Sequence, residues 1–204
     1  MEETKELIIE SSKYGKFTVL VDAEDWERVS QHKWHVRRNK NQNGWCDQFY
    51  VRTMMPMPEG KWYTYTSKKG LSYKHQQQRS LHLHRFLMDV PGNMVVDHIS
   101  GDTMDNRKSN LRICTLVENF RNRKRNKNNT SGYKGVHYAK KAKDMIREFS
   151  NPWIARISLD GKRKFIGSYN TPEEAGKAYD AFAKEHYGEF ARLNFPEENN
   201  VSQV

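Results

Sequence analysis

Asp97 and His98 are adjacent in the sequence and could act together with Asn119, which follows later in the chain. Hydrolysis of a phosphodiester needs a base that activates water. It also needs a divalent cation that stabilises charge on the phosphate and on the leaving 3′ oxygen. Asp97 is a hard anionic ligand for Mg²⁺ or Mn²⁺, and Asn119 offers a neutral amide oxygen. His98 faces the other side of a strand, so we expect it to act as the base rather than as a ligand.

The elements that must position these residues are predicted from apolar runs and turn signals. Residues 95–98 suit a buried strand, and residues 110–113 suit a strand that returns after a turn. Thr115 and Glu118 have capping-box spacing, which predicts a helix from about Leu116 onward. The expected order is strand, loop, strand and helix.

This pattern resembles the HNH endonucleases of the H-N-N type found in phage homing enzymes. The matching residues are Asp97, His98, Asn110 and Asn119, together with LHRFLM at 83–88, DNR at 105–107 and NLR at 110–112. The resemblance implies a ββα-metal fold with one divalent ion bound by Asp97 and Asn119, and His98 as the general base. It also implies that Asn110 orients the histidine and fixes the loop.

Three further residues of this segment have two interpretations each. His84 matches the histidine of the family's LHR segment, and we favour packing or support of the site over direct metal ligation. Arg107 and Arg112 are either phosphate contacts or ordinary solvated arginines. A single Asp-His pair or a group of asparagines is also common in structural turns, so the prediction depends on the matching positions occurring together.

Positive charge is concentrated beyond this segment. The chain has 204 residues and a formal net charge of +10, and residues 121–147 hold ten basic side chains with Asp144 as the sole acid. The run at 123–132 is either a solvated linker or a tether that grips the DNA backbone through released counterions. The basic residues expected to contact DNA there are Arg121, Arg123, Lys124, Arg125 and Lys127.

Residues 130–196 resemble an AP2 domain, the DNA-binding fold of plant ERF factors that also occurs fused to HNH nucleases. The resemblance lies in SGYKGV at 131–136, W-x-A-x-I from Trp153, IGSYNTPEEAGKAYDAFA at 166–183 and G-x-x-A-x-LNFP at 188–196. Strand alternation then places one set of side chains on the open face of a three-stranded sheet, where arginine can read guanine. This set is Lys134, His137, Arg156, Ser158, Arg163 and Phe165. An insertion at 140–151 and Phe165, where ERF factors carry tryptophan, depart from the family pattern.

Composition excludes several classes of protein. Cys46 and Cys114 form no CxxC pair, so we expect neither a disulfide framework nor a structural zinc. No apolar run is long enough to cross a membrane, and no signal peptide is indicated, so we expect a cytoplasmic protein of a bacterial or phage-infected cell.

The predicted fold is α+β. A strand-rich region of unknown role (1–80) leads into an HNH unit (81–122), a basic linker (123–132), an AP2-like domain (133–196) and a tail (197–204). We expect a homing-type endonuclease that binds double-stranded DNA and uses one Mg²⁺ or Mn²⁺, either as a monomer or as a homodimer. The alternatives are a non-catalytic AP2-type transcriptional regulator with the HNH unit as scaffold and, less favoured, an RNA-binding or RNA-cutting protein.

Overall fold

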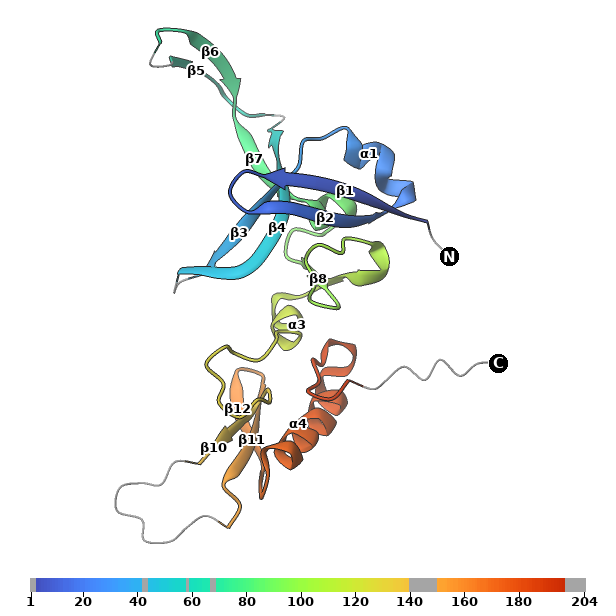
Figure 1. Cartoon of the computed structure of the whole chain (residues 1–204), viewed down its shortest axis with the longest axis vertical. Helices are drawn as coiled ribbons and strands as arrows, with labels where there is room; N and C mark the ends of the chain where they lie inside the picture. The colour runs from blue at the N-terminus through green and yellow to red at the C-terminus, as the bar shows by residue number, and fades with distance from the viewer. Residues whose placement is uncertain (1–2, 42–43, 58, 67–68, 140–149, 197–204) are drawn as a thin grey trace. The chain divides into compact units, whose positions relative to one another are not determined.

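The computed structural model describes residues 3–41, 44–57, 59–66, 69–139 and 150–196. The chain forms two compact units, Met1–Thr115 and Leu116–Val204. Each unit has its own hydrophobic core, and both combine strands with short or medium helices, as expected for an α+β protein (Figure 1). Within the described part of the chain, no helix is long and apolar enough to cross a membrane.

The first unit begins with an antiparallel hairpin of β1 (Thr4–Ser11) and β2 (Gly15–Asp22). Gly15 has a φ of 84°, a left-handed conformation that glycine adopts without a steric penalty, and it lies at the turn between the two strands. A 3-10 turn η1 (Ala23–Asp25) and the helix α1 (Trp26–Ser30) follow.

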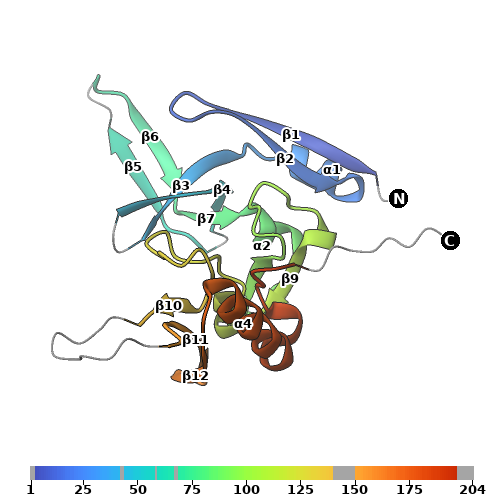
Figure 2. The same cartoon turned by 60° about the horizontal axis from the view of Figure 1, so that its bottom comes forward.

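A three-stranded antiparallel sheet follows, with strand order β3-β4-β7. These strands are β3 (His35–Asn41), β4 (Gly44–Pro56) and β7 (Gln78–His82). Between β4 and β7 the chain forms a separate hairpin of β5 (Trp62–Thr66) and β6 (Ser72–Gln76). Both views show this hairpin projecting from the rest of the first unit (Figures 1 and 2).

The segment with the candidate site has the expected order of elements. The helix α2 (Leu83–Leu87) precedes β8 (Val95–His98), and the 3-10 turn η2 (Lys108–Asn110) leads into β9 (Leu111–Cys114). β8 and β9 pair in antiparallel fashion, and α3 (Leu116–Arg121) comes next. The first unit ends at Thr115, so α3 belongs to the second unit.

One core extends from the N-terminal strands to β8 and β9. Its buried members come from β1, β2, α1, β3, β4, α2, β8 and β9, and include Val19, Val21, Val51, Leu83, Val96 and Leu111. Full burial of such a side chain contributes roughly 1.5–3 kcal/mol. The expected boundary at residue 80 therefore falls inside a single core, and strands of the N-terminal region support the β8–β9 hairpin.

The edge of β2 also binds the loop that joins β8 to β9. Leu20 donates its N–H to the carbonyl of Met104 (2.9 Å) and accepts from the N–H of Asn106 (2.8 Å). The carboxylate of Asp22 accepts from the N–H of Lys108 at 2.7 Å. Because these bonds hold backbone on both sides, the N-terminal hairpin fixes the path of the loop.

The second unit contains an antiparallel sheet with strand order β10-β11-β12 and one long helix. The strands are β10 (Val136–Tyr138), β11 (Trp153–Leu159) and β12 (Lys162–Tyr169). The helix α4 (Pro172–Tyr187) is followed by the 3-10 turn η3 (Gly188–Phe190). The insertion predicted at 140–151 lies outside the described residues except for its last two positions, and the predicted tail at 197–204 lies wholly outside them.

The helix α4 begins with a capping box. The side chain of Thr171 accepts from the N–H of Glu174, and the carboxylate of Glu174 accepts from the N–H of Thr171. The apolar side of α4 packs on β11 as the alternation predicts, and the buried residues of this core include Ala155, Ile157, Ala175, Tyr179 and Ala183. Gly135 has a φ of 77°, and a Cβ atom there would lie 2.1 Å from the Tyr179 ring, which explains the glycine in the SGYKGV run.

Candidate active site

The β8–β9 hairpin places Asp97 and His98 at the end of β8. Asp97 lies opposite Arg112 in the strand register, and His98 lies opposite Leu111. Neighbouring residues of a strand face opposite sides, so the carboxylate and the imidazole occupy different faces of the hairpin. Both residues are buried, with 6% and 5% of their surface exposed. Burial of two ionisable side chains requires specific partners.

The partner of Asp97 is Arg112 on the neighbouring strand. Both Nε and Nη2 of Arg112 donate to Oδ2 of Asp97, at 3.0 and 2.8 Å. This ion pair is largely buried, so it is screened less by water than a surface pair is. The structure thus pairs Arg112, a candidate phosphate contact, with Asp97, the predicted metal ligand.

Asn110 holds the loop between the two strands closed. Its Oδ1 accepts from the N–H of Ser100 at 2.9 Å, and its Nδ2 donates to the carbonyl of Asp105 at 2.8 Å. Its own carbonyl accepts from the N–H of Ile99. These contacts support the loop-fixing role that the family resemblance implies for Asn110, whereas its effect on the His98 ring stays a prediction.

The His98 ring contacts a different asparagine, Asn106. The Nε2 atom of His98 lies 3.3 Å from Oδ1 of Asn106, which is almost completely buried. The Nδ2 atom of Asn106 donates to the carbonyl of Thr103, and a carbonyl can only accept, so this bond fixes the orientation of the amide. Oδ1 must then accept from His98, which places the proton of the neutral ring on Nε2 and the basic lone pair on Nδ1.

Two further histidines and a tyrosine surround the His98 ring. The centroid of the His84 ring lies 5.1 Å from that of His98, nearly perpendicular to it, and 5.2 Å from that of His82, nearly parallel to it. The Tyr50 ring lies 5.8 to 6.3 Å from all three. His84 therefore packs within a cluster of rings, and its role at the site stays a prediction.

Burial keeps these imidazoles neutral. It lowers the pKa of His84 to about 2, with smaller contributions from the nearby His98, His82 and Arg85. It also lowers the pKa of His98, although the hydrogen bond to Asn106 and the nearby aspartates act in the opposite direction. A neutral His98 at pH 7 can accept a proton, as a general base must.

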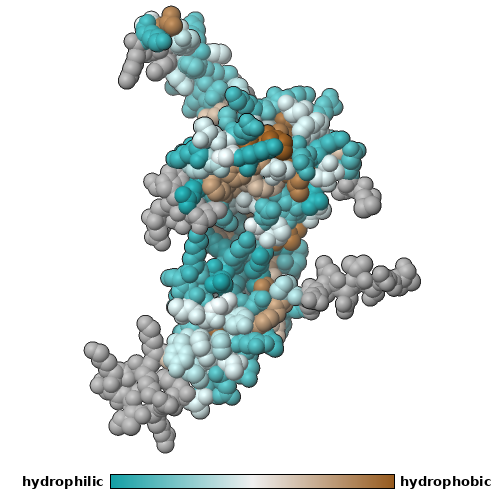
Figure 3. All heavy atoms as spheres, in the orientation of Figure 1, coloured by the Kyte–Doolittle hydropathy of each residue, from teal (hydrophilic) through white to brown (hydrophobic). Residues whose placement is uncertain are grey.

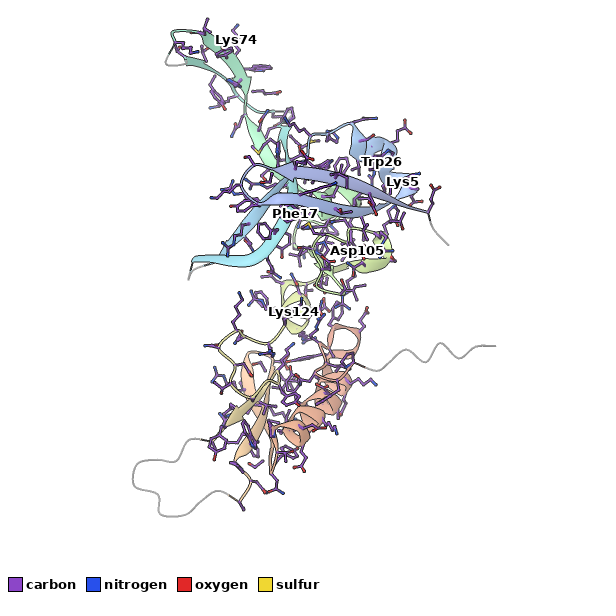
Figure 4. The ribbon with its side chains drawn as sticks, in the orientation of Figure 1. Lys5, Phe17, Trp26, Lys74, Asp105 and Lys124 are labelled. Carbon is purple, nitrogen blue, oxygen red and sulfur yellow. The ribbon has the colours of Figure 1, made fainter. Side chains whose placement is uncertain are left out.

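Arg107, the second predicted phosphate contact, forms an ion pair within the loop. Its Nε and Nη2 atoms donate to the two carboxylate oxygens of Asp105, at 2.8 and 2.7 Å. These bonds lower the pKa of Asp105. Figure 4 shows Asp105 on the loop between β8 and β9. A phosphate contact by Arg107 would have to share its guanidinium with Asp105.

The remaining predicted ligand, Asn119, lies half-buried on α3 of the second unit. Among the described residues, no group of three or more His, Cys, Asp or Glu side chains is placed to hold a metal ion. The predicted donors, one carboxylate and one amide oxygen, suit a hard divalent cation that keeps several waters. The donor chemistry thus fits Mg²⁺ or Mn²⁺, and the pairing of Asp97 with Asn119 stays a prediction.

The predicted DNA-reading face of the second unit lies on the side of the sheet away from α4. Arg156 pairs with Phe165 and Ser158 pairs with Arg163 across β11 and β12, and these four side chains are exposed. The pKa of His137 is lowered by partial burial and by the charges of Arg156 and Arg163, so the three side chains lie near one another.

Lys134 has a different environment from the rest of the predicted face. Its Nζ donates to the carbonyl of Arg121 at the end of α3, and burial lowers the pKa of Lys134 to about 8. The guanidinium of Arg121 lies 4.7 Å from the centre of the Tyr187 ring. Both residues thus have structural contacts within the second unit. The other predicted residues of the basic linker are exposed: Arg123, Lys124, Arg125 and Lys127.

Comparison with known proteins identifies the class. Residues 83–121 match the HNH endonuclease family. An uncharacterized HNH endonuclease of Acanthamoeba polyphaga mimivirus is 32% identical over 140 residues, covering 66% of this chain and 66% of that protein. Protein 3.8 of Escherichia phage T7 is 32% identical over 104 residues, covering 51% of this chain and 78% of that protein. The chain belongs to the HNH endonuclease family.

A second group of relatives consists of plant transcription factors. An ethylene-responsive transcription factor of Arabidopsis thaliana is 42% identical over 67 residues, which cover 32% of each chain. The chain thus spans about a third of that relative's length. No solved structure matches the chain. Together the matches support an HNH unit combined with an AP2/ERF-type domain.

Sequence reasoning missed three residues that the structure places at or near the site. Asn106 belongs to the DNR run that carries the resemblance, but only the fold reveals its contact with His98. Tyr50 and Asp22 come from strands far away in the sequence. An acidic residue directly after an apolar strand, such as Asp22, indicates a functional or capping position. The sequence does not show that its partner is the backbone N–H of Lys108.

Proposed function

We propose that the protein is a homing-type DNA endonuclease that hydrolyses one phosphodiester with His98 as the general base and one divalent cation. The observation that carries this proposal is the buried Asp97-His98 pair at the end of β8, within the segment that matches the HNH family. The neutral His98, with its proton held on Nε2 by Asn106, has the protonation state that the reaction needs.

The proposed reaction begins when Nδ1 of His98 takes a proton from a water molecule. The resulting hydroxide oxygen bonds to phosphorus while the bond from phosphorus to the 3′ oxygen breaks, and that oxygen leaves with a proton from solvent. The products are a 5′ phosphate and a 3′ hydroxyl. Asp97 and Asn119 are the proposed ligands of Mg²⁺ or Mn²⁺, which when bound supplies charge stabilisation at the phosphate and the leaving oxygen.

We propose that the second unit binds the target and that the exposed basic linker contacts the DNA backbone. The resemblance to plant transcription factors and the exposed Arg156 and Arg163 support this role. A single nuclease site cuts one strand, so a monomer would nick DNA, and cleavage of both strands would need a second subunit or a second binding event. We propose that the enzyme acts in the cytoplasm of a bacterial or phage-infected cell.

The test compares the wild type with His98→Ala on supercoiled plasmid in the presence of Mg²⁺ or Mn²⁺. We expect the variant to lose cleavage and to keep its affinity for a DNA duplex measured in EDTA. His35→Ala removes an exposed histidine of β3 in the same unit and serves as the matched control, with cleavage unchanged. Cleavage by His98→Ala at the wild-type rate would refute the assignment of the base.

The same assay addresses the non-catalytic alternative. A wild-type protein that binds duplex DNA and leaves the plasmid intact with either metal would be a DNA-binding regulator rather than a nuclease. Mapping of cut ends on phage or host DNA would give the target sequence.

A further inference from the structure

None of the candidate active-site residues described above lies on the β5–β6 hairpin. Its strands pair with each other, from Trp62 opposite Gln76 to Thr66 opposite Ser72. They form a two-stranded sheet of their own, separate from β3-β4-β7. An isolated two-stranded hairpin is at best marginally stable in water, so its retention as a projecting element needs an explanation.

Large aromatic side chains on this hairpin are exposed to solvent. Trp62 is 66% exposed, Tyr63 is 56% exposed and Tyr73 is 48% exposed. The strand register places Trp62 with Thr64 and Lys74 on one face, and Tyr63 with Tyr73 on the other. An open hollow is lined by Trp62, Tyr63, Thr64 and Lys74. Exposed aromatic rings gathered on one small element indicate a binding surface.

The charge of the hairpin identifies its partner. Residues 61–77, which contain the hairpin, hold four basic side chains and no acidic one, a net charge of +4. The preceding sixty residues contain nine basic and ten acidic side chains, a net charge of −1. Lys61, Lys69 and Lys74 are exposed (Figure 4 labels Lys74 on the hairpin), and hydrophilic residues cover most of the hairpin surface in Figure 3. The positive charge is thus specific to this element and complementary to a polyanion.

We propose that the β5–β6 hairpin binds duplex DNA as a contact separate from the AP2-like unit. A two-stranded antiparallel ribbon has the width that the major groove of B-form DNA admits. Lys61, Lys69 and Lys74 neutralise phosphates, and Trp62, on the same face as Lys74, contacts the sugar surface of the groove. This proposal takes DNA as the partner from the proposed function, and it assigns a role to the strand-rich N-terminal region, which carries no sequence motif.

The test measures binding of the full-length chain to a labelled DNA duplex in EDTA over a series of salt concentrations. Each phosphate contact contributes about 0.9 to the slope of log K against log salt concentration. The combined variant Lys61→Gln, Lys69→Gln and Lys74→Gln should therefore lower the magnitude of the slope by about 2 to 3.

The control removes the same charge from exposed lysines elsewhere in the first unit, as Lys13→Gln, Lys16→Gln and Lys33→Gln. We expect this control to keep a slope close to that of the wild type. A second hairpin variant, Trp62→Ala, should weaken binding about tenfold with little change in the slope, as loss of a large aromatic contact does. Because these side chains are exposed, thermal unfolding of all variants should match that of the wild type.

Three outcomes would overturn the proposal. The first is a hairpin variant whose slope and affinity match those of the lysine control. The second is a change in self-association, measured by light scattering, with DNA binding unaltered, which would make the hairpin a protein interface. The third is an effect on RNA binding alone. Plasmid cleavage by the wild type and His98→Ala is measured separately, so failure of the nuclease proposal is distinguishable from failure of the hairpin proposal.

Discussion

At the scale of single residues, Asn106 determines which nitrogen of His98 carries the proton. A neutral imidazole can carry its proton on either nitrogen, and the other nitrogen then holds the basic lone pair. The amide of Asn106 selects that arrangement because its nitrogen is committed to the carbonyl of Thr103. The base of the proposed reaction is thus prepared before DNA binds.

Replacement of Asn106 by leucine should therefore lower the cleavage rate by about 10- to 100-fold and leave DNA affinity in EDTA unchanged. Long-range ¹H–¹⁵N NMR of the imidazole would report the tautomer. We expect the proton on Nε2 in the wild type and a mixture of both tautomers in Asn106→Leu.

Asn106→Asp is a second variant: the carboxylate keeps an acceptor oxygen facing Nε2 and should keep the proton there, but it loses the bond to Thr103 and should raise the pKa of His98. If Asn106→Leu retained both the tautomer and the rate, Asn106 would have a structural role only. Thermal unfolding of both variants separates a loss of folding from a loss of chemistry.

At the scale of secondary-structure elements, the loop between β8 and β9 depends on β2. Backbone hydrogen bonds from Leu20 and the carboxylate of Asp22 hold Met104, Asn106 and Lys108 in place. The loop has little regular structure of its own, and its backbone is held in place by hydrogen bonds to β2. Rigid placement of this loop also fixes Asn106 against His98.

Asp22→Ala should lower the free energy of unfolding by about 1–3 kcal/mol, because the N–H of Lys108 loses its acceptor. Cleavage should fall as well, since the loop carries Asn106. Urea unfolding monitored by circular dichroism would measure the first effect and plasmid nicking the second.

Asp22→Asn retains an acceptor oxygen and should recover most of the stability. Glu10→Ala, an exposed acidic residue on the neighbouring β1, should have little effect. Equal losses in Asp22→Ala and Glu10→Ala would show that the bond to Lys108 does not stabilise the loop.

Most elements could be predicted from the sequence because their signals are local. The apolar run before Asp97, the capping box of Thr171 and the apolar stripe of α4 each require only neighbouring residues. The contact between β2 and the loop could not be predicted, because Asp22 and Lys108 are 86 positions apart and the acceptor binds a backbone N–H. Every residue except proline has a backbone N–H, so the residue type at position 108 does not indicate this bond. The same reason explains why the sequence leaves two interpretations open for Arg112: its partner Asp97 becomes visible only in the strand register.

At the scale of the whole molecule, the net positive charge is concentrated in two segments of the sequence. Residues 61–77 carry +4 and residues 121–147 carry +9, so the other segments together are acidic within the net charge of +10. The HNH segment lies between these two in the chain. Binding and cutting are thus assigned to different parts of one polypeptide, which raises the local concentration of substrate for each.

This separation predicts that Arg156→Gln combined with Arg163→Gln will raise the KM for target DNA and leave kcat unchanged. Loss of one specific bidentate contact to guanine costs about 1–3 kcal/mol, or about 5- to 150-fold in affinity. Lys177→Gln with Lys184→Gln removes the same charge from exposed positions of α4 and should change KM little. A drop in kcat at saturating DNA would contradict the separation of roles.

The ion pair between Asp97 and Arg112 has a consequence for how the enzyme is assembled. A buried carboxylate that depended on a metal ion for its counter-charge would tie folding to the supply of that ion. Here Arg112 provides the counter-charge of Asp97, so the first unit can fold without a bound metal ion. Under the proposed function, a chelator should therefore stop plasmid cleavage reversibly and leave the circular dichroism spectrum unchanged.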